Sequence, residues 1–216
     1  MREILIIGKG ARFTRPELKA DPQTYPVITP TAAVGILSAI YWKPEFWWRI
    51  RAITILSPIK IVPITYNHIQ SSSDKSVDIR DIKNVRMQRR CTELRDVCYR
   101  ISAEIVALDG NPNKHLGVFR ERLDRGKFFK QPVMGTCEHF ATVQWDDGRE
   151  PEVLINKDFG YMPWYFQPQL NLKSQYTAVS PTQKGQLVGI NPHFNQFRAI
   201  AKDSVITVPA YEYETF

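Results

Sequence analysis

The sequence lacks the residue patterns that mark most metal centres, disulfide frameworks and phosphate-binding loops. Its three cysteines are an odd number without CxxC spacing, which favours reduced thiols over disulfides or a zinc site. Its four histidines are scattered, with no HxxxH pair and no carboxylate cluster at ligand spacing. There is no GxxxxGKS loop, and "GKGARF" (8–13) lacks the third glycine and following helix of a dinucleotide site. We therefore expect no metal and no cofactor.

Long apolar runs are also missing. No stretch approaches the roughly 18 uninterrupted apolar residues of a membrane span. The first residues, "MREILIIGKGARF", contain too short an apolar run for a signal peptide. These absences predict a soluble, cytoplasmic protein without a membrane partner.

Positive charge is present in excess. The 29 Lys and Arg residues outnumber the 22 Asp and Glu residues, giving a formal net charge of +7. A field of this sign raises the encounter rate with phosphates, so it favours a polyanionic partner such as nucleic acid. Many basic proteins bind no nucleic acid, so charge alone leaves the partner open.

Hydrophobic periodicity predicts an α+β fold. Turn and helix-cap residues separate the predicted elements: a strand at 3–13, a helix at 31–43 ended by Pro44, one strand or two at 46–69 interrupted at Pro58 and Pro63, a strand at 92–108, a helix from Pro112 to Gly126, and a strand at 133–145. This order is the βαββαβ of a ferredoxin-like, RRM-like domain. We assign it to residues 1–150 and expect residues 151–216 to add a small C-terminal antiparallel β-sheet. The polar stretch 70–85 is expected to be a mobile or conditionally ordered loop.

One helix start combines titratable residues. Lys114 and His115 follow Pro112 in the first turn, where unpaired backbone N–H groups and the helix dipole favour an anion. RNA cleavage by its own 2′-hydroxyl needs a base, a cation for the charge on the phosphorane, and an acid for the leaving 5′-oxygen. A Lys-His pair at a helix end is more often plain solvated surface, and the spacing does not separate the two interpretations.

Basic residues cluster in the sequence around this helix and the strand before it. The candidates for RNA contacts are Arg86, Arg89, Arg90, Arg120, Arg122, Lys127 and Lys130. Phe128 and Phe129 lie between two of these lysines, a pattern typical of stacking platforms for unpaired bases. If the βαββαβ prediction holds, the strand and the helix lie close together and form one basic surface.

Several long motifs resemble one family. The segment "ARFTRPELKADPQTYPVITPTAAVGILSAIYWKPEF" closely resembles the N-terminal signature of the CRISPR-associated Cas five family, in the d variant found in type I-C systems. Three further motifs follow that family's pattern in the same order: "RRCTELRDVCYRISAEI", "NKHLGVFRERLDRGKFFKQPVMGTCEHF" and "FRAIAKDSVITVP". The resemblance covers most of the chain and implies the RAMP-superfamily fold, a ferredoxin-like domain with a C-terminal β-sheet.

The resemblance also implies an activity. It suggests a metal-independent endoribonuclease that cleaves the CRISPR repeat in pre-crRNA 3′ of its hairpin, giving a 2′,3′-cyclic phosphate. Such proteins then stay on the crRNA 5′ handle as a subunit of the interference complex, with the other type I-C subunits as partners and double-stranded DNA as a further candidate partner. The family's catalytic residues fall on Tyr41, Lys114 and His115, with proton transfer expected of His115, charge stabilisation of Lys114, and positioning or shared acid–base work of Tyr41. With an ordinary pKa of about 10, tyrosine is a poor base unless Lys114 lowers that value.

Two alternatives remain at this point. A non-catalytic crRNA-binding scaffold subunit of the same complex would have the same fold and basic surface, so the three candidate catalytic residues alone separate it from a nuclease. A generic RNA-recognition module is disfavoured, because no RNP-type aromatic pair occupies the usual strand positions.

Overall fold

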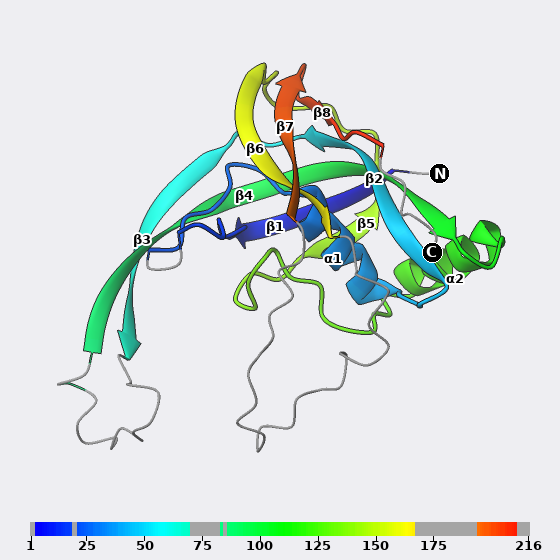
Figure 1. Cartoon of the computed structure of the whole chain (residues 1–216), viewed down its shortest axis with the longest axis horizontal. Helices are drawn as coiled ribbons and strands as arrows, with labels where there is room; N and C mark the ends of the chain where they lie inside the picture. The colour runs from blue at the N-terminus through cyan, green and yellow to red at the C-terminus, as the bar shows by residue number, and fades with distance from the viewer. Residues whose placement is uncertain (1–2, 19–20, 70–82, 84–85, 167–193, 211–216) are drawn as a thin grey trace.

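The computed structural model describes residues 3–18, 21–69, 83, 86–166 and 194–210 (Figure 1). The elements along the chain are β1 (Ile4–Ala11), α1 (Pro30–Ile40), β2 (Phe46–Ile55), β3 (Lys60–Ile69), β4 (Arg86–Ala107), α2 (Pro112–Asp124), β5 (Thr142–Trp145), β6 (Lys157–Phe166), β7 (Phe194–Lys202) and β8 (Val205–Thr207). Both predicted helices are present. Residues 46–69 form two strands, the second of the two predicted alternatives.

A large antiparallel sheet organises the described residues into a mixed α/β fold. Its strand order is β5-β1-β4-β2-β8-β7-β6, with β3 paired to β4 off this path. The 22-residue β4 is the organising element, since it pairs with β1, β2 and β3. Figure 1 shows it running the length of the molecule, with β3 beside its first half and α2 after its far end.

Alternation along the strands divides the sheet into two faces. On β1, Ile4 and Ile6 join the main core with the buried sides of both helices, whereas Leu5 packs on the opposite face with Leu56 and Cys98. The period of two is what a strand between two different surroundings requires. Because α1 and α2 share one core, they cover the same face of the sheet and their ends lie near each other.

α1 begins as the sequence predicts and ends earlier. The Thr29 hydroxyl accepts a hydrogen bond from the Ala32 N–H, which caps the first turn. The predicted end at residue 43 is wrong, since the helix stops at Ile40 and Tyr41 is extended. Pro44 explains this: it has no N–H to continue the helix ladder to the Ile40 carbonyl. That carbonyl instead accepts from the Arg122 guanidinium and the Phe129 N–H.

Of the two prolines predicted to interrupt the strands of residues 46–69, one lies between two strands and the other lies inside a strand. Pro58 falls in the gap between β2 and β3, as predicted. Pro63 lies inside β3, opposite Thr92, so its predicted interruption is wrong. Within the described residues β3 pairs with β4 alone, and a strand at a sheet edge tolerates a residue that cannot donate to a second neighbour. Apart from Lys83, the predicted loop at 70–85 lies outside the described residues.

The predicted strand at 133–145 is too long, because β5 covers only its last four residues. The preceding segment turns back on itself, with the Met134 N–H donating to the His139 carbonyl and the Arg12 N–H donating to the Met134 carbonyl. Gly135 has a φ of +89°, and a Cβ there would lie 2.1 Å from the Arg12 carbonyl oxygen. The turn therefore requires glycine at this position.

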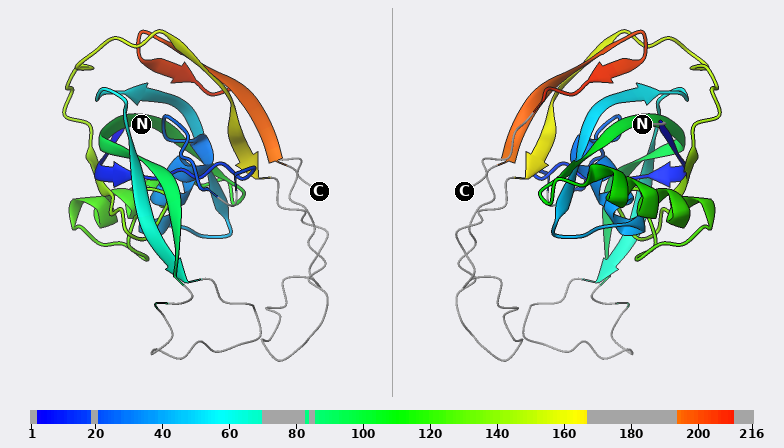
Figure 2. Two further views of the ribbon diagram at one scale, coloured as in Figure 1. Left: turned by 90° about the vertical axis from the view of Figure 1, so that its left-hand side faces the viewer. Right: turned by 90° about the vertical axis from the view of Figure 1, so that its right-hand side faces the viewer.

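The C-terminal strands extend the same sheet. β8 pairs with β2 and β7, and β7 pairs with β6. Figure 2 shows these strands arching over the rest of the molecule, and β6 reaches α1. Within residues 151–216, expected to add a small antiparallel sheet, residues 152–156 form no strand, β6 was not predicted, and residues 167–193 and 211–216 lie outside the described residues. Among the described helices, none has the length and apolar character needed to cross a bilayer.

Candidate active site

Lys114 and His115, in the first turn of α2, differ in exposure. Pro112 occupies the first turn, where its missing N–H costs nothing, and Gly126 follows the C-cap with a φ of +62°. His115 and Phe119, one turn apart, are the buried residues of this helix, whereas the Lys114 side chain is 63% exposed. The imidazole of His115 therefore takes a place in the core, one turn before Phe119.

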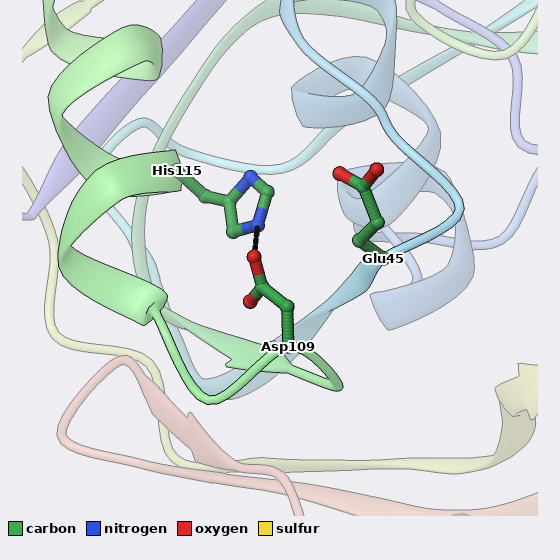
Figure 3. A group of neighbouring side chains, drawn as sticks. All are labelled: Glu45, Asp109 and His115. Atoms are coloured by element: carbon green, nitrogen blue, oxygen red, sulfur yellow. Dashed lines mark hydrogen bonds and ion pairs between the residues drawn. The ribbon is translucent and has the colours of Figure 1, made fainter.

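His115 is held on both of its ring nitrogens. The Tyr41 hydroxyl lies 3.0 Å from Nδ1, and Asp109 Oδ2 lies 3.2 Å from Nε2. The Phe46 ring packs against the imidazole with centroids 4.7 Å apart. Figure 3 shows Asp109 reaching the imidazole from the connection before α2. The structure thus brings together Tyr41 and His115, which the resemblance paired across more than 70 positions, and adds Asp109.

Sequence reasoning missed Asp109. Its signal is local: an aspartate two residues before a helix N-cap, in "DGNP", is suited to an Asx turn. The structure has that turn, with the Asn111 N–H donating to Asp109 Oδ1 at 3.0 Å. This leaves Oδ2 free to accept from His115, so a turn residue also orients the imidazole.

The protonation of Asp109 sets the direction of the hydrogen bonds. The Asn111 N–H, the His115 side chain and the Lys114 charge lower the pKa of the Asp109 carboxyl. An ionised carboxylate only accepts hydrogen bonds, so Nε2 of His115 carries the hydrogen and donates it. When the ring carries this one hydrogen, Nδ1 is the acceptor, and the Tyr41 hydroxyl donates to it. The network assigns one order: Tyr41 to His115 to Asp109.

Tyr41 is a neutral phenol in this setting. Burial raises its pKa, the Glu45 carboxylate adds to the rise, and the cations Arg122 and Lys114 oppose it without reversing it. The Arg122 guanidinium lies 5.0 Å from the centre of the Tyr41 ring, a cation–π distance. Lys114 therefore does not bring the Tyr41 pKa below its ordinary value. A tyrosine with a raised pKa is a poor base on its own. Proton transfer from the phenol needs an acceptor, and His115 Nδ1 is in place.

Lys114 stands at the solvent-exposed edge of this cluster. Its Nζ lies 3.7 Å from Asp109 Oδ2, which makes it a partner of the same carboxylate that holds His115. The mostly exposed ammonium can reach an approaching phosphate. The His115 side chain is only 1% exposed and Tyr41 is 4% exposed, so Lys114 is the exposed member of the three predicted catalytic residues.

Glu45 completes a set of potential metal ligands. One ligand atom each from Glu45, Asp109 and His115 lie within 4.8 Å of one another (Figure 3). Both ring nitrogens of His115 are already engaged, so a cation would have to displace Asp109 or Tyr41 from the imidazole. The expectation that the protein uses no metal stays a prediction.

The predicted RNA-binding residues do not form one surface. Arg86, Arg89 and Arg90 lie at the start of β4, paired with β3, whereas α2 follows the other end of β4 (Figure 1). The expected proximity of that strand segment to the helix is therefore wrong, because β4 is far longer than predicted. Arg122 donates to the Ile40 carbonyl at 2.9 Å, so it fastens α2 to the end of α1. Side chains near the candidate site are exposed at Arg120, Lys127 and Lys130.

Comparison with known proteins agrees with the sequence motifs. The family model for Cas5d, described as CRISPR-associated protein (Cas_Cas5), matches residues 5–164, which include Tyr41, Asp109 and the start of α2. The chain belongs to the Cas5d family. Two relatives are named CRISPR pre-crRNA endoribonuclease Cas5d. The one from Mannheimia succiniciproducens is 35% identical over 95% of this chain and 93% of its own length. The one from Thermus thermophilus is 31% identical over 98% of this chain and 93% of its own length.

Solved structures support the fold. A crystal structure of a CRISPR-associated protein superposes with a TM-score of 0.63 at 20% identity, covering 97% of this chain and 91% of that one. An uncharacterized protein from Streptococcus mutans gives a TM-score of 0.58 at 17% identity, with coverage of 97% and 92%. At these identities the likeness concerns the mixed α/β architecture with its large antiparallel sheet.

Proposed function

We propose that this chain is an endoribonuclease that cleaves the CRISPR repeat in pre-crRNA 3′ of the repeat hairpin. Two Cas5d relatives are named for pre-crRNA cleavage, which supports the substrate. The observation that carries the proposal is the ordered chain from the Tyr41 hydroxyl through His115 to Asp109, beside the exposed Lys114. A buried proton relay next to an exposed cation has the components that RNA transesterification requires.

The proposed reaction uses the RNA's own 2′-hydroxyl as nucleophile. As the 2′-oxygen bonds to phosphorus, its proton passes to the Tyr41 oxygen while the phenolic proton moves to His115 Nδ1. The carboxylate of Asp109 stabilises the imidazolium that forms. The bond from phosphorus to the 5′-oxygen breaks, the relay returns the proton to that oxygen, and Lys114 offsets the charge on the phosphorane. The products are a 2′,3′-cyclic phosphate and a 5′-hydroxyl, and no metal takes part.

The finer architecture belongs to the same proposal. The strand order β5-β1-β4-β2, with α1 and α2 on one face, supports a ferredoxin-like unit in which β3 is an added edge strand. We place this unit in residues 1–150 and treat residues 151–216 as a C-terminal β extension of it. The catalytic residues then lie where the two helices meet, at one end of the sheet.

The proposed RNA contacts divide into two groups. Arg120, Lys127 and Lys130 are exposed beside the candidate site and suit the backbone near the scissile phosphate. Arg86, Arg89 and Arg90 lie on the two-stranded β3–β4 ribbon, formed by β3 and the first part of β4. We expect them to contact a more distant part of the repeat. We further propose that the product stays bound at its 5′ handle, in the cytoplasm, with other subunits of the type I-C interference complex. Double-stranded DNA remains a candidate partner.

The deciding experiment is cleavage of the cognate repeat RNA in excess chelator. The unmutated protein should cut once per repeat, and His115→Ala and Lys114→Ala should bind the RNA with cleavage reduced by about 100-fold or more. Lys157→Ala, which removes an exposed lysine from β6, is the matched control for Lys114→Ala. Undiminished cleavage by His115→Ala would remove its assigned role, and a requirement for added metal would remove the mechanism.

The second candidate function is a non-catalytic crRNA-binding subunit. It predicts tight binding of the repeat with no cleavage by the unmutated protein under any metal condition. The satisfied Tyr41–His115–Asp109 network, built at the cost of burying an imidazole, favours the nuclease.

A further inference from the structure

Three large aromatic side chains are exposed beside the candidate site. Trp42 is 56% exposed, Phe128 is 50% exposed and Phe129 is 78% exposed. Neighbouring rings such as Tyr41 and Phe46 are buried in the core. Exposed apolar side chains are unremarkable when scattered, but a group of them on a soluble protein marks an interaction surface. We call Trp42, Phe128 and Phe129 the aromatic shelf.

Backbone hydrogen bonds place the aromatic shelf against the end of α1. The Phe129 N–H donates to the Ile40 carbonyl at 3.3 Å, and the Lys130 N–H donates to the Ala39 carbonyl at 2.9 Å. Trp42 follows Ile40 by two residues, so the two segments that carry the shelf are fastened side by side. Tyr41 lies between Ile40 and Trp42. In Figure 1 the connection after α2 passes beside this end of α1.

The shelf is joined to the candidate site by one side chain. The Arg122 guanidinium donates to the Ile40 carbonyl and also lies over the Tyr41 ring. The segment 127–130 begins at the end of α2, the helix that carries Lys114 and His115. A polymer whose phosphate reached Lys114 and Tyr41, and whose chain ran along α2 toward its C-terminal end, would pass over the shelf with its adjoining nucleotides.

The charge around the shelf indicates which polymer. Lys43 follows Trp42 directly, and Lys127 and Lys130 flank the two phenylalanines, all with exposed side chains. Rings alternating with cations bind single-stranded nucleic acid, because bases stack on the rings while ammonium groups meet the phosphates. Bases in a duplex already stack on one another, so a shelf of this kind takes unpaired ones. An apolar protein partner would gain nothing from the three lysines.

We propose that the aromatic shelf binds the unpaired nucleotide next to the scissile phosphate by stacking its base. The proposal rests on the proposed function and deepens it: the substrate is the junction between hairpin and single strand, and the unpaired side of that junction lies on Trp42, Phe128 and Phe129. Stacking there would hold the scissile phosphate beside Tyr41 and Lys114.

The test uses a repeat RNA that binds without being cut. A 2′-deoxy substitution at the cleavage site removes the nucleophile, and 2-aminopurine at the unpaired position next to it reports stacking by loss of fluorescence. Binding to the unmutated protein should quench this probe. Phe129→Leu should abolish much of the quenching and weaken binding by about fivefold or more, whereas Phe129→Tyr should retain both. Tyr161→Ala on β6, where the ring is 63% exposed, is the control and should change neither.

The outcomes separate failure of the aromatic shelf from failure of the proposed nuclease activity. Unaltered quenching in Phe129→Leu and in Trp42→Ala would overturn the shelf, as would quenching of a probe in the paired stem instead. Unchanged RNA binding together with lost assembly into a larger protein complex would assign the shelf to a protein partner and also overturn it. Quenching that depends on Phe129, with no cleavage of the all-ribose RNA, would support the shelf and overturn the nuclease.

Discussion

The Tyr41 hydroxyl and His115 Nδ1 are buried polar atoms that form a hydrogen bond with each other. The hydroxyl and Nδ1 lie 3.0 Å apart in a region where both side chains are almost completely buried. Leaving a buried donor or acceptor unpaired costs about 1–3 kcal/mol, so the pair contributes to stability as well as to the proposed chemistry. Assays of variants at either position therefore need unfolding curves beside them.

Asp109 is predicted to act through His115. Asp109→Asn keeps the shape of the side chain and removes the negative charge that stabilises the imidazolium. The cleavage rate should fall by about tenfold or more while the dissociation constant for uncleaved repeat RNA stays the same. Asp96→Asn, at an exposed aspartate paired with Lys60, is the control. An equal loss of RNA affinity in Asp109→Asn would point to a structural or RNA-binding role instead.

The lowered pKa of Asp109 adds a pH signature to this prediction. Because the folded protein depresses this pKa, the carboxylate stays charged at any pH above its ordinary value of 3.8. The rate difference between Asp109→Asn and the unmutated protein should thus persist from neutral to mildly acidic pH. Single-turnover rates across that range would measure it, and a difference that vanished near pH 6 would contradict a lowered pKa.

The sequence could predict some of the individual residues of the candidate site. Resemblance grouped Tyr41, Lys114 and His115, and the structure brings the three side chains together around Asp109 and His115. Asp109 was missed because its partner atoms come from a turn and a helix whose relative direction no local pattern gives. Arg122 was predicted as an RNA contact, and the structure uses it to hold the Ile40 carbonyl, a need created by Pro44 far away in sequence.

Among the elements, α1 and β4 determine where the chemistry can occur. α1 ends at Ile40 and turns Tyr41 toward α2, which places the phenol over His115. β4 carries the chain from the β3–β4 ribbon to the start of α2. The ribbon and the candidate site are thereby separated by most of the sheet, so RNA contacts at both imply a substrate that extends along the molecule.

The ribbon arginines are predicted to hold RNA without affecting the chemical step. Arg86→Ala combined with Arg90→Ala should weaken repeat binding and reduce the slope of log K against log salt concentration by about two. The single-turnover rate at saturating protein should stay unchanged. Lys157→Ala combined with Lys202→Ala, which removes two exposed lysines from β6 and β7, is the matched control. An unchanged slope in the arginine variant would place the RNA on another face.

Element types were predictable where the pattern is local. Both helices have cap and stop residues next to apolar periodicity, and β1 begins as a short apolar run, with Gly8 and Gly10 inside the strand. Element lengths were less predictable, because Pro63 is tolerated at an edge strand and β4 lengthens through pairing with β3. The turn before β5 depends on a contact between Gly135 and the Arg12 carbonyl, which only the folded chain reveals.

Over the whole molecule, the sheet joins the N-terminal and C-terminal parts. β8 pairs with β2, and the Ser204 side chain accepts from the Ile155 N–H and donates to the Val153 carbonyl. The α+β composition and the presence of strands near the C-terminus were predictable from alternation, whereas β6 was not. The continuity of the sheet was not, since strand pairing across 150 residues leaves no trace in a single sequence.

Because the C-terminal strands pack into the main core, we expect them to unfold together with the rest of the described chain. Ile206 on β8 is fully buried in the main core, so Ile206→Ala should lower the free energy of unfolding of the whole chain by about 2–5 kcal/mol. Ile200→Ala on β7, where the side chain is 43% exposed, should change it far less. Denaturant unfolding followed at the tryptophans of β2 would measure both. Loss of the C-terminal strands alone, with the β2 signal unmoved, would show that the two parts fold independently.

In the proposed mechanism, the Tyr41 hydroxyl transfers the proton in RNA cleavage. Tyr41→Phe removes that one oxygen and keeps the ring, which stacks on Phe46 at 5.2 Å. The decisive measurement is the single-turnover cleavage rate of repeat RNA in chelator, below the unfolding transition and at saturating protein, with Tyr161→Phe as control. We predict a fall of about 100-fold or more in Tyr41→Phe with unchanged RNA affinity. Cleavage by Tyr41→Phe at the unmutated rate would contradict it.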